Sequence, residues 1–413
     1  MSGLLRNRTI ILVFLGLIAL CLVGYLQLRG ERYQRDFTTF YAAATVYADG
    51  GDPYDLTALQ QAAAADILPY LYPPLTLPIF RVFTILPLSA ARTVWLWLRA
   101  GILIGLLWIW RKMIHSDGSG ATFYILALFA FGGAIFLDLK AGNVSIIEQF
   151  LLWSGFYFLL TDRPGLFCTG VVAASVLKGA PILFLLLLPL LGSRRAWTYL
   201  TRSVVAFGLF QIVNYLAYPS MYLEYISKAV SWDERAAQTN PSALALLKDL
   251  GDWFAAHGLS LQFAHLLSLF AYAIIALAVL LVSHRIYREI RRTPIETTSD
   301  SFKQKLALIY LSTLVYGLLV PRFKLYSFIL VLPAAFYVIR KYASASAVLI
   351  WVVLLSLPAH PAFPMPPQFL ANFWLYYPLG TLFLLWGVWA THCKQSRIDE
   401  RVLAPSQTVR FEP

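Results

Sequence analysis

The chain carries little charge for its size, because only 13% of its 413 residues are Asp, Glu, Lys or Arg, against the roughly 25% usual in soluble domains. Cysteine is also scarce: the three residues lie far apart, so neither a disulfide framework nor a thiolate metal site is expected. No Asp-x-Asp pair follows the first apolar run, and the histidines lack metal-ligand spacing. The composition excludes an ordinary water-soluble globule and predicts no metal or other cofactor.

Apolar side chains are abundant instead, at 59% of the residues and a mean hydropathy of +0.67. One core cannot hide this excess, because a soluble chain still needs a polar surface. A membrane-spanning helix needs about 20 apolar residues, so about a dozen spans would use ~240 residues and leave ~170 for loops and tails. The sequence therefore predicts an all-α polytopic membrane protein of about 12 spans with short outer-face helices.

The net charge of +12 would suggest nucleic acid as a partner in a soluble chain. Here the basic residues lie in short clusters between apolar runs, which is typical of cytoplasmic loops, so no nucleic-acid partner is expected. The first apolar run, residues 9–28, is interpreted as a retained signal anchor. With every basic cluster and both termini inside, the predicted spans are 9–28, 89–110, 121–138, 144–160, 165–177, 180–192, 197–217, 262–283, 306–320, 325–339, 343–357 and 372–391.

This topology predicts one transmembrane domain, 1–392, with two sizeable outer loops, 29–88 and 218–261, and a cytoplasmic tail, 393–413. Within the first loop, residues 75–86 are apolar but interrupted by proline and arginine, so they are expected to be interfacial or re-entrant.

The neighbouring spans 165–177 and 180–192 are short and separated by the sequence Lys178-Gly-Ala-Pro181. They are expected to be broken or tilted helices that meet at depth. Irregular backbone at that depth must be covered by protein or line a cavity. The sequence leaves both of these possibilities open for the backbone near Lys178.

Asp36 follows the first predicted span by about eight residues and opens an aromatic-rich helix with Phe37, Phe40 and Tyr41. Such a helix can fold back onto the membrane interface and hold the carboxylate over it. A carboxylate held there can act as a general base. The alternative is a solvated acidic residue paired with a nearby arginine. Farther along, Asp55 is a plausible N-cap for a helix over 56–66.

Lys178, Arg322 and Lys324 are expected at outer helix ends, where an ionisable group is costly unless it is paired or functional. A lipid phosphate would supply a partner, since Lys and Arg are natural phosphate ligands. Snorkelling to outer headgroups is the alternative. Glu148 is an intramembrane carboxylate and so a functional candidate, with a structural pair to Lys140 as the alternative.

Several weak motifs, taken in order, resemble glycosyltransferase family 87. They are Asp36-Phe-x-x-x-Tyr41, Gly51-x-Pro-Tyr54-Asp, Tyr70-Leu-Tyr72-Pro-Pro, Ala141-Gly-Asn143, Lys178-x-x-Pro181, Asn240-Pro-Ser242 and the turn Pro321 to Tyr326. The resemblance implies a GT-C fold enzyme, mostly bacterial, that uses polyprenyl-phosphate sugars such as mannose. It places the chain in the cytoplasmic membrane with its active site on the periplasmic side, acting on a lipid or glycan acceptor.

Carried onto this chain, the resemblance implies Asp36 as the catalytic base and Lys178, Arg322 and Lys324 as ligands of the donor phosphate. The remaining predicted substrate-binding residues are Tyr41, Tyr54, Tyr72, Arg81, Asn143, Glu148, Asn240 and Tyr326. The chain departs from the family pattern in two places: it has no His within 321–327 and no Gln before Asn143.

The resulting expectation is an inverting glycosyltransferase, with the lipid-linked sugar as substrate. Two alternatives remain open from the sequence. A transporter or flippase of a lipid-linked saccharide would share the lipid groove and the basic residues but would not need Asp36. A polysaccharide polymerase or ligase would also act at the outer face but would transfer a preassembled chain.

Overall fold

The fold is built from helices. Within the described part of the chain, every regular element is an α-helix or a short 3-10 helix and none is a strand, which confirms the all-α class. The first predicted span, 9–28, lies almost entirely outside that part. The computed structural model describes residues 24–25, 34–114, 120–192, 195–235, 239–357 and 374–403.

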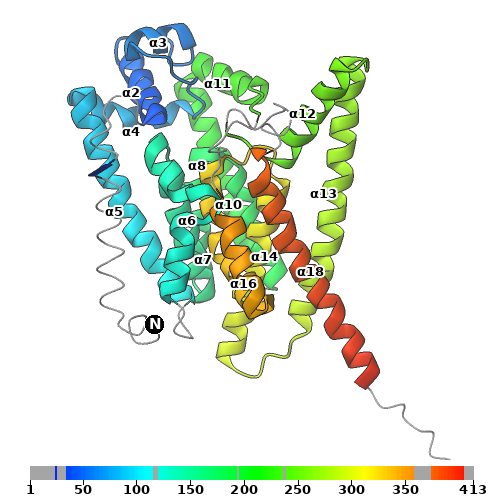
Figure 1. The fold of residues 1–413 in the computed structure, drawn as a ribbon. Coiled ribbons are helices and arrows are strands. Elements are labelled where there is room, and N and C mark those ends of the chain that lie inside the picture. The colour runs from blue at the N-terminus through cyan, green and yellow to red at the C-terminus, as the bar shows by residue number, and fades with distance from the viewer. Residues whose placement is uncertain are drawn as a thin grey trace, which may run out of the picture.

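Long helices run side by side and form a bundle (Figure 1). They are α5 (Leu88–Ile114), α6 (Gly120–Ala141), α7 (Ser145–Leu160), α8 (Pro164–Lys178), α10 (Ala196–Ala217), α13 (Leu261–Arg292), α14 (Thr298–Leu319), α15 (Leu332–Tyr342), α16 (Ala345–Ser356) and α18 (Tyr377–Leu403). Two 3-10 segments belong to the same bundle: η5 (Ala180–Leu186) leads into α9 (Leu187–Leu191), and η7 (Leu325–Val331) leads into α15. Helix α18 continues through residue 393, the predicted start of the tail.

Short helices from the two predicted outer loops gather at one end of the bundle (Figure 1). The first loop supplies α2 (Arg35–Ala48), α3 (Leu56–Ala63), η3 (Pro74–Thr76), α4 (Leu77–Arg81) and η4 (Val82–Ile85), and the second supplies α11 (Pro219–Ser231) and α12 (Ala243–Ala256). Segments far apart in the sequence therefore share one end of the molecule.

Four helices of the described residues are long and apolar enough to cross a membrane: Leu88–Ile114, Ala196–Ala217, Leu261–Arg292 and Leu325–Tyr342. Leu126–Ala141 and Ser145–Leu160 pass this test together, bent by 117°, and would make a fifth. Length and composition thus support a membrane protein with four or five spans, and the other predicted spans stay predictions.

The local predictions for the first outer loop are confirmed in part. Helix α3 begins at Leu56, and the Asp55 carboxylate accepts a hydrogen bond from the Thr57 backbone N–H at 2.9 Å, as expected for an N-cap. The helix ends at Ala63, earlier than expected, because Ala64 adopts a left-handed conformation. Residues 74–85 form only short helical pieces that expose large apolar side chains, as an interfacial segment would.

The break expected near Lys178 is present. Helix α8 ends at Lys178, Gly179 follows with a φ of 67°, and the chain continues as the 3-10 segment η5. A positive φ is readily available only to glycine, so Gly179 allows the chain to turn there. The break leaves the ammonium group of Lys178 beside the start of α7, where it contacts Ser145.

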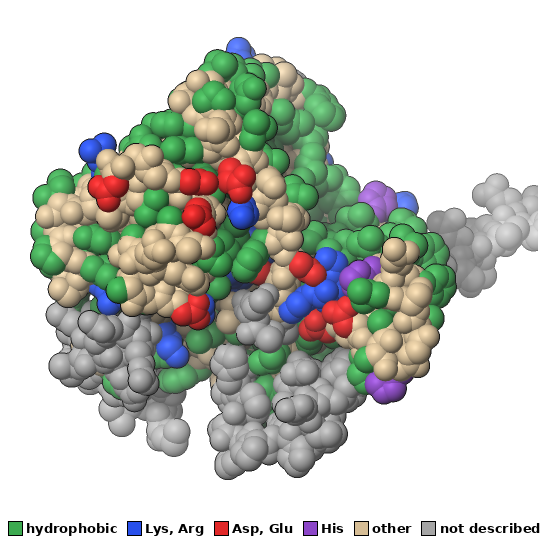
Figure 2. All heavy atoms as spheres, turned by 90° about the horizontal axis from the view of Figure 1, so that it is seen from above, with side chains coloured by type: hydrophobic (Ala, Val, Ile, Leu, Met, Phe, Trp, Pro, Cys, Tyr) green, Lys and Arg blue, Asp and Glu red, His purple; other side chains and the backbone are tan. Residues whose placement is uncertain are grey.

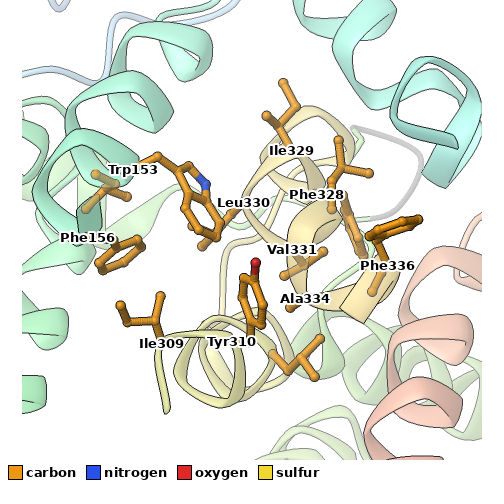
Figure 3. Close-up of a cluster of buried hydrophobic side chains, with 14 of the residues drawn as sticks. Trp153, Phe156, Ile309, Tyr310, Phe328, Ile329, Leu330, Val331, Ala334 and Phe336 are labelled. Atoms are coloured by element: carbon orange, nitrogen blue, oxygen red, sulfur yellow. The ribbon is translucent and has the colours of Figure 1, made fainter. Parts of the chain in front are cut away.

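Two apolar clusters hold the fold together. The bundle core contains Trp153 and Phe156 of α7, Tyr310 of α14 and the buried residues of η7 and α15, which face one another in Figure 3. The outer cluster joins α2 to α5 and α4 through aromatic pairs, among them Phe37 with Trp95 at 5.2 Å between ring centres. Val144 belongs to the outer cluster and Ile146 to the core, so the turn between α6 and α7 lies where the two clusters meet.

Candidate active site

A cavity of about 380 Å³ opens at the end of the bundle that carries α2 and α11. Figure 2, which looks onto this end, shows acidic and basic side chains close together between apolar ones. Segments from six parts of the chain line the cavity: the start of α2, residues 68–72, the region around α7, the break after α8, residues 225–234 of α11 and the segment after it, and residues 316–327. The predicted site residues among its lining are Asp36, Tyr72, Asn143, Glu148, Lys178, Arg322, Lys324 and Tyr326.

The other four predicted substrate contacts lie outside the lining. The hydroxyl groups of Tyr41 and Tyr54 donate to backbone carbonyls, of Leu86 at 2.9 Å and of Tyr72 at 2.7 Å. Arg81 is exposed at the end of α4. The side chain of Asn240 is buried and used for backbone contacts. None of the four lines the cavity, and their contact with a substrate stays a prediction.

Asp36 is held by a side-chain amide from a distant turn. The Asn143 Nδ2 donates to Asp36 Oδ2 at 2.6 Å, and the Tyr326 hydroxyl donates to the same oxygen at 3.4 Å. The Asn143 Oδ1 accepts from the backbone N–H of Ser145 at 3.1 Å and from its hydroxyl at 2.9 Å, which sets the orientation of the amide. Asp36 also lies in the first turn of α2, where the helix dipole stabilises a negative charge.

Arg35 lies 3.7 Å from Asp66, and among the described residues it makes no ion pair with Asp36; the other arginine considered, Arg32, lies outside those residues. Close to Asp36 in the cavity is Tyr72, whose hydroxyl lies 3.4 Å from Asn143 Nδ2. Burial, reinforced by the carboxylate of Asp36, raises the pKa of Tyr72 well above its usual range. Tyr72 therefore stays a neutral hydroxyl at pH 7.

A glycine allows the turn that carries Asn143 to approach α2. Gly142 has a φ of 79°, and a Cβ there would lie 2.8 Å from the Cβ of Gln34 and 2.9 Å from the Cβ of Phe37. Two hydrogen bonds fasten the contact, from Trp95 Nε1 to the carbonyl of Gly142 and from the Gln34 N–H to the carbonyl of Lys140, each at 2.8 Å. The contact brings Asp36 and Asn143 together across 107 residues of sequence.

The sequence interpretation missed a buried ion pair behind this turn. Arg99 of α5 and Asp138 of α6 lie 3.3 Å apart, and both side chains are 0% exposed. The Arg99 guanidinium also donates to the carbonyls of Asp138 at 2.8 Å, Leu139 at 2.7 Å and Asn143 at 3.1 Å. It thereby satisfies carbonyl groups at the C-terminus of α6. The signal in the sequence was an arginine in the middle of an apolar span.

Lys178 is the first of the cavity's cations. Its ammonium lies 2.7 Å from Glu148 Oε2 and donates to the hydroxyl of Ser145. The structure therefore pairs Glu148 with Lys178, where the sequence also allowed Lys140. The Lys178 ammonium lies 5.4 Å from the ring centre of Tyr326, and the Lys324 ammonium lies 5.8 Å from it. Tyr326 is thus a neighbour of both cationic groups and of Asp36.

Arg322 and Lys324 share the carboxylate of Glu234. The Arg322 Nε lies 2.7 Å from Glu234 Oε2, and the Lys324 Nζ lies 2.8 Å from Glu234 Oε1. Burial alone would raise the pKa of Glu234, but Lys324 and Arg322 hold it below its usual range. Its pairing with these cations depends on the folding of the second outer loop.

Asn240 holds this part of the site in shape. Its Oδ1 accepts from the Phe323 N–H at 2.8 Å, and its Nδ2 donates to the carbonyl of Glu234 at 3.0 Å. Ser242 donates from its hydroxyl to the carbonyl of Pro321 at 2.5 Å. The Asn-x-Ser motif therefore braces the turn that carries Arg322.

In chemical terms the cavity holds a fixed carboxylate, two groups of cations and neutral hydroxyls. Asp36 can accept a proton, and the cations can hold an anionic group beside it. Across the described ranges, no group of three or more His, Cys, Asp and Glu residues is arranged to hold a metal ion.

Comparison with known proteins gives one match. The family model described as Glycosyltransferase family 87 matches residues 70–301, more than half of the chain. The matched range contains Tyr72, Asn143 and Lys178 but neither Asp36 nor Arg322. Nothing matches among the curated proteins or among the solved structures.

Proposed function

Because this chain belongs to glycosyltransferase family 87, we propose that it is an inverting membrane glycosyltransferase. It moves a hexose, with mannose as the first candidate, from a polyprenyl-phosphate donor to a lipid or glycan acceptor. The observation that carries the proposal is the shared cavity: Asp36 lies in it together with Lys178, Arg322 and Lys324. A base and an anion site are the two parts that such a transfer needs.

The proposed setting is the bacterial cytoplasmic membrane, with a GT-C-like bundle of about twelve spans and the cavity on the periplasmic side. Helical segments occupy most of each predicted span from 89–110 onward, and α6 is interrupted by non-helical backbone at residues 130–133. Helices α5 and α13 end, with basic residues in their last turns, at the end of the bundle away from α2 and α11 (Figure 1). Basic residues mark the cytoplasmic side, which supports the proposal that the cavity end is the outer one.

In the proposed reaction, an acceptor hydroxyl attacks the anomeric carbon from the face opposite the phosphate. The new carbon–oxygen bond forms as the bond to the phosphate oxygen breaks, and the electron pair leaves on the phosphate. The hydroxyl proton passes to Asp36. Attack from the opposite face inverts the anomeric configuration, and the departing phosphate needs no protonating acid.

The hydrogen bonds of Asp36 suit this role. Among the described residues, both side-chain hydrogen bonds to its carboxylate go to Oδ2, from Asn143 and Tyr326. Oδ1 is therefore the oxygen that accepts the proton. General-base help of this kind is worth typically about 10²–10⁴-fold in rate.

The cations supply the other part of the barrier reduction. Lys178 with Arg322 and Lys324 would hold the donor phosphate, which gains negative charge as the sugar leaves. Groups aimed at charge that develops in the transition state stabilise it more than the ground state. The donor is a substrate, and the proposed step uses no cofactor.

The proposal is tested by incubating the purified protein with a panel of polyprenyl-phosphate sugars and membrane lipid extracts. Mass spectrometry is expected to show one sugar added to an acceptor and release of polyprenyl phosphate. A product that carries many sugars would instead indicate a polymerase or ligase.

A parallel assay with reconstituted protein follows labelled donor lipid across a bilayer. If the lipid crosses and no new glycosidic bond forms with any donor, the glycosyltransferase proposal is wrong and the protein is a transporter or flippase.

A further inference from the structure

The proposed phosphate site already holds an anion. Glu234 contacts Arg322 through one carboxylate oxygen and Lys324 through the other, and its Oε1 also accepts from Trp232 Nε1 at 3.1 Å. The side chain of Glu234 is 3% exposed, while those of Lys324 and Arg322 are 12% and 37% exposed. The carboxylate therefore lies beneath the cations, and Arg322 keeps a face toward the cavity.

The charges that line the cavity balance without a ligand. The cations are Lys178, Arg322 and Lys324, and the carboxylates are Asp36, Glu148 and Glu234. A donor phosphodiester brings one negative charge, and the phosphate monoester that leaves carries about −1.5 to −2. Like charges repel strongly in a site of low dielectric constant. A carboxylate that shares cations with the phosphate would therefore weaken its binding, unless that carboxylate moves.

Two of the three carboxylates belong to helices, whereas the third, Glu234, lies outside them and its backbone carbonyl accepts from Asn240 Nδ2 at 3.0 Å. Asp36 belongs to α2 and is bonded to Asn143. Glu148 is buried in the first turn of α7, where its backbone N–H is bonded to the carbonyl of Val144. Glu234 instead lies in the non-helical segment 232–235 that follows α11. Of the three, it is the one that can withdraw without breaking a helix.

We propose that Glu234 is an internal competitor for the donor phosphate, an inference that rests on the proposed function. In the empty enzyme its carboxylate takes the place of the phosphate on Arg322 and Lys324. The donor displaces it, and its return after transfer helps to expel polyprenyl phosphate. The step exchanges ion pairs and neither forms nor breaks a covalent bond. Glu234 thus sets the donor affinity and the rate of product release.

The test measures binding of polyprenyl phosphate, the proposed product, to purified protein. Glu234→Gln keeps the size and the hydrogen-bonding oxygen but removes the charge, so we expect the Kd to fall about tenfold or more. In the transfer assay, KM should fall and kcat should fall with it, because product leaves more slowly. An unchanged or higher Kd in a folded Glu234→Gln protein overturns the proposal.

Asp233→Asn is the matched control. Asp233 is the neighbouring carboxylate, but it pairs with Arg235 at 2.8 Å and with Lys248 at 2.9 Å and does not line the cavity. Its replacement should leave the Kd within about twofold of wild type. An equal gain in affinity in both variants would mean that general negative charge, and not the place of Glu234, weakens binding, and would overturn the proposal.

A second measurement needs no substitution. Hydrogen exchange of the backbone amides in 232–235 is followed in wild-type protein before and after polyprenyl phosphate is added. Displacement of Glu234 releases this segment, so its exchange should rise. Unchanged or slower exchange at saturating polyprenyl phosphate would contradict the proposal.

Arg322→Gln separates this proposal from the proposed function. If Arg322→Gln weakens binding at least tenfold and Glu234→Gln does not tighten it, the phosphate site stands and the internal competitor is wrong. If neither change alters the Kd, the phosphate does not bind here, and the assignment of the phosphate site fails as well.

Discussion

Two arginine–carboxylate pairs lie near Asp36, and they differ in what surrounds them. The pair of Arg99 and Asp138 is wholly buried, and Arg99 also donates to three backbone carbonyls. Arg322 is 37% exposed toward the cavity, and its partner Glu234 belongs to a non-helical segment. Arg99 donates hydrogen bonds to backbone carbonyls and therefore holds the backbone in place. Arg322 is partly exposed and is therefore available to a ligand.

This difference between the two arginine pairs indicates separate roles for the Asp36 side and the Arg322 side of the cavity. On the Asp36 side, helix ends, Gly142 and Arg99 hold the carboxylate and its amide partner in one arrangement. On the Arg322 side, Asn240 braces a turn whose cations are neutralised by a carboxylate that can be exchanged. In the proposed mechanism, Asp36 is therefore fixed before substrate binds, and the anion site is adjustable.

The largest expected effect comes from removing the carboxylate of Asp36. Asp36→Asn should lower turnover by about 10²–10⁴-fold and leave folding and donor binding intact, because the amide keeps the size of the carboxylate but cannot take the proton. Turnover and the Kd of polyprenyl phosphate are measured on the same preparation. Near-normal turnover would reject Asp36 as the base.

Asp66→Asn is the control for this change. Asp66 lies in the same outer loop and is 86% exposed, with Arg35 as its only described ion-pair partner. Its variant should retain wild-type turnover.

The buried pair should matter for stability more than the exposed one. Arg99→Met leaves Asp138 buried without its cation, which is expected to cost about 3–5 kcal/mol of unfolding free energy. Arg322→Met should cost less, because Glu234 keeps Lys324, but it should weaken donor binding. Thermal unfolding and polyprenyl phosphate binding distinguish the two variants. Equal losses of stability would contradict the division between them.

The double variant Arg99→Met/Asp138→Leu sharpens the same contrast. A hydrophobic pair of similar volume often restores the stability lost with a buried ion pair. Turnover should stay low nonetheless, because the carbonyl of Asn143 loses its donor. Full recovery of turnover would show that Arg99 does not position Asn143.

The approach of the Asn143 turn to α2 is tested by Gly142→Ala. Overpacking against Gln34 and Phe37 should cost about 1–3 kcal/mol, in addition to the strain of a positive φ. Gly50→Ala shares the positive φ, at 78°, but has nothing within 4 Å. Only Gly142→Ala should lower turnover. Equal effects on turnover in the two variants would mean that the close contact does not position Asp36.

The smallest expected effect is the pH dependence of the Glu234 pairs. The pKa of Glu234 is lowered in the folded protein, so its contribution to stability is present above the unfolded value of about 4.3 and is lost as the pH falls through the lower folded value. The difference in Tm between wild type and Glu234→Gln should shrink as the pH falls below about 5. A difference that stays constant down to about pH 3 would show that the ion pairs do not stabilise the loop.

Hydrophobic runs and turn chemistry predicted the local features well. Helices cover the predicted spans of the described residues, Asp55 caps α3, and the chain breaks after Lys178. These features depend on neighbouring residues. The grouping of Asp36 with Lys178, Arg322 and Lys324 could be predicted from their expected positions at outer helix ends.

The long-range partners could not be predicted. Glu234 and Arg99 meet their partners only through the packing of distant segments, and no local spacing indicates which partners these are. Tyr41, Tyr54 and Asn240 are expected to bind substrate, a prediction that stays open, and in the structure their polar atoms are bonded to backbone groups. A buried hydroxyl or amide must find a partner wherever it lies, so residue type alone does not separate a substrate contact from a structural one.

The central claim is that Asp36 faces the sugar of a donor whose phosphate lies on the cations of the same cavity. An experimental structure with a non-cleavable polyprenyl-phosphonate sugar bound tests it most directly. The phosphonate is expected within hydrogen-bond distance of Lys178 or Arg322, with the anomeric carbon facing the Asp36 carboxylate across room for one hydroxyl group. A phosphonate bound elsewhere, or an anomeric carbon turned away from Asp36, would contradict the claim.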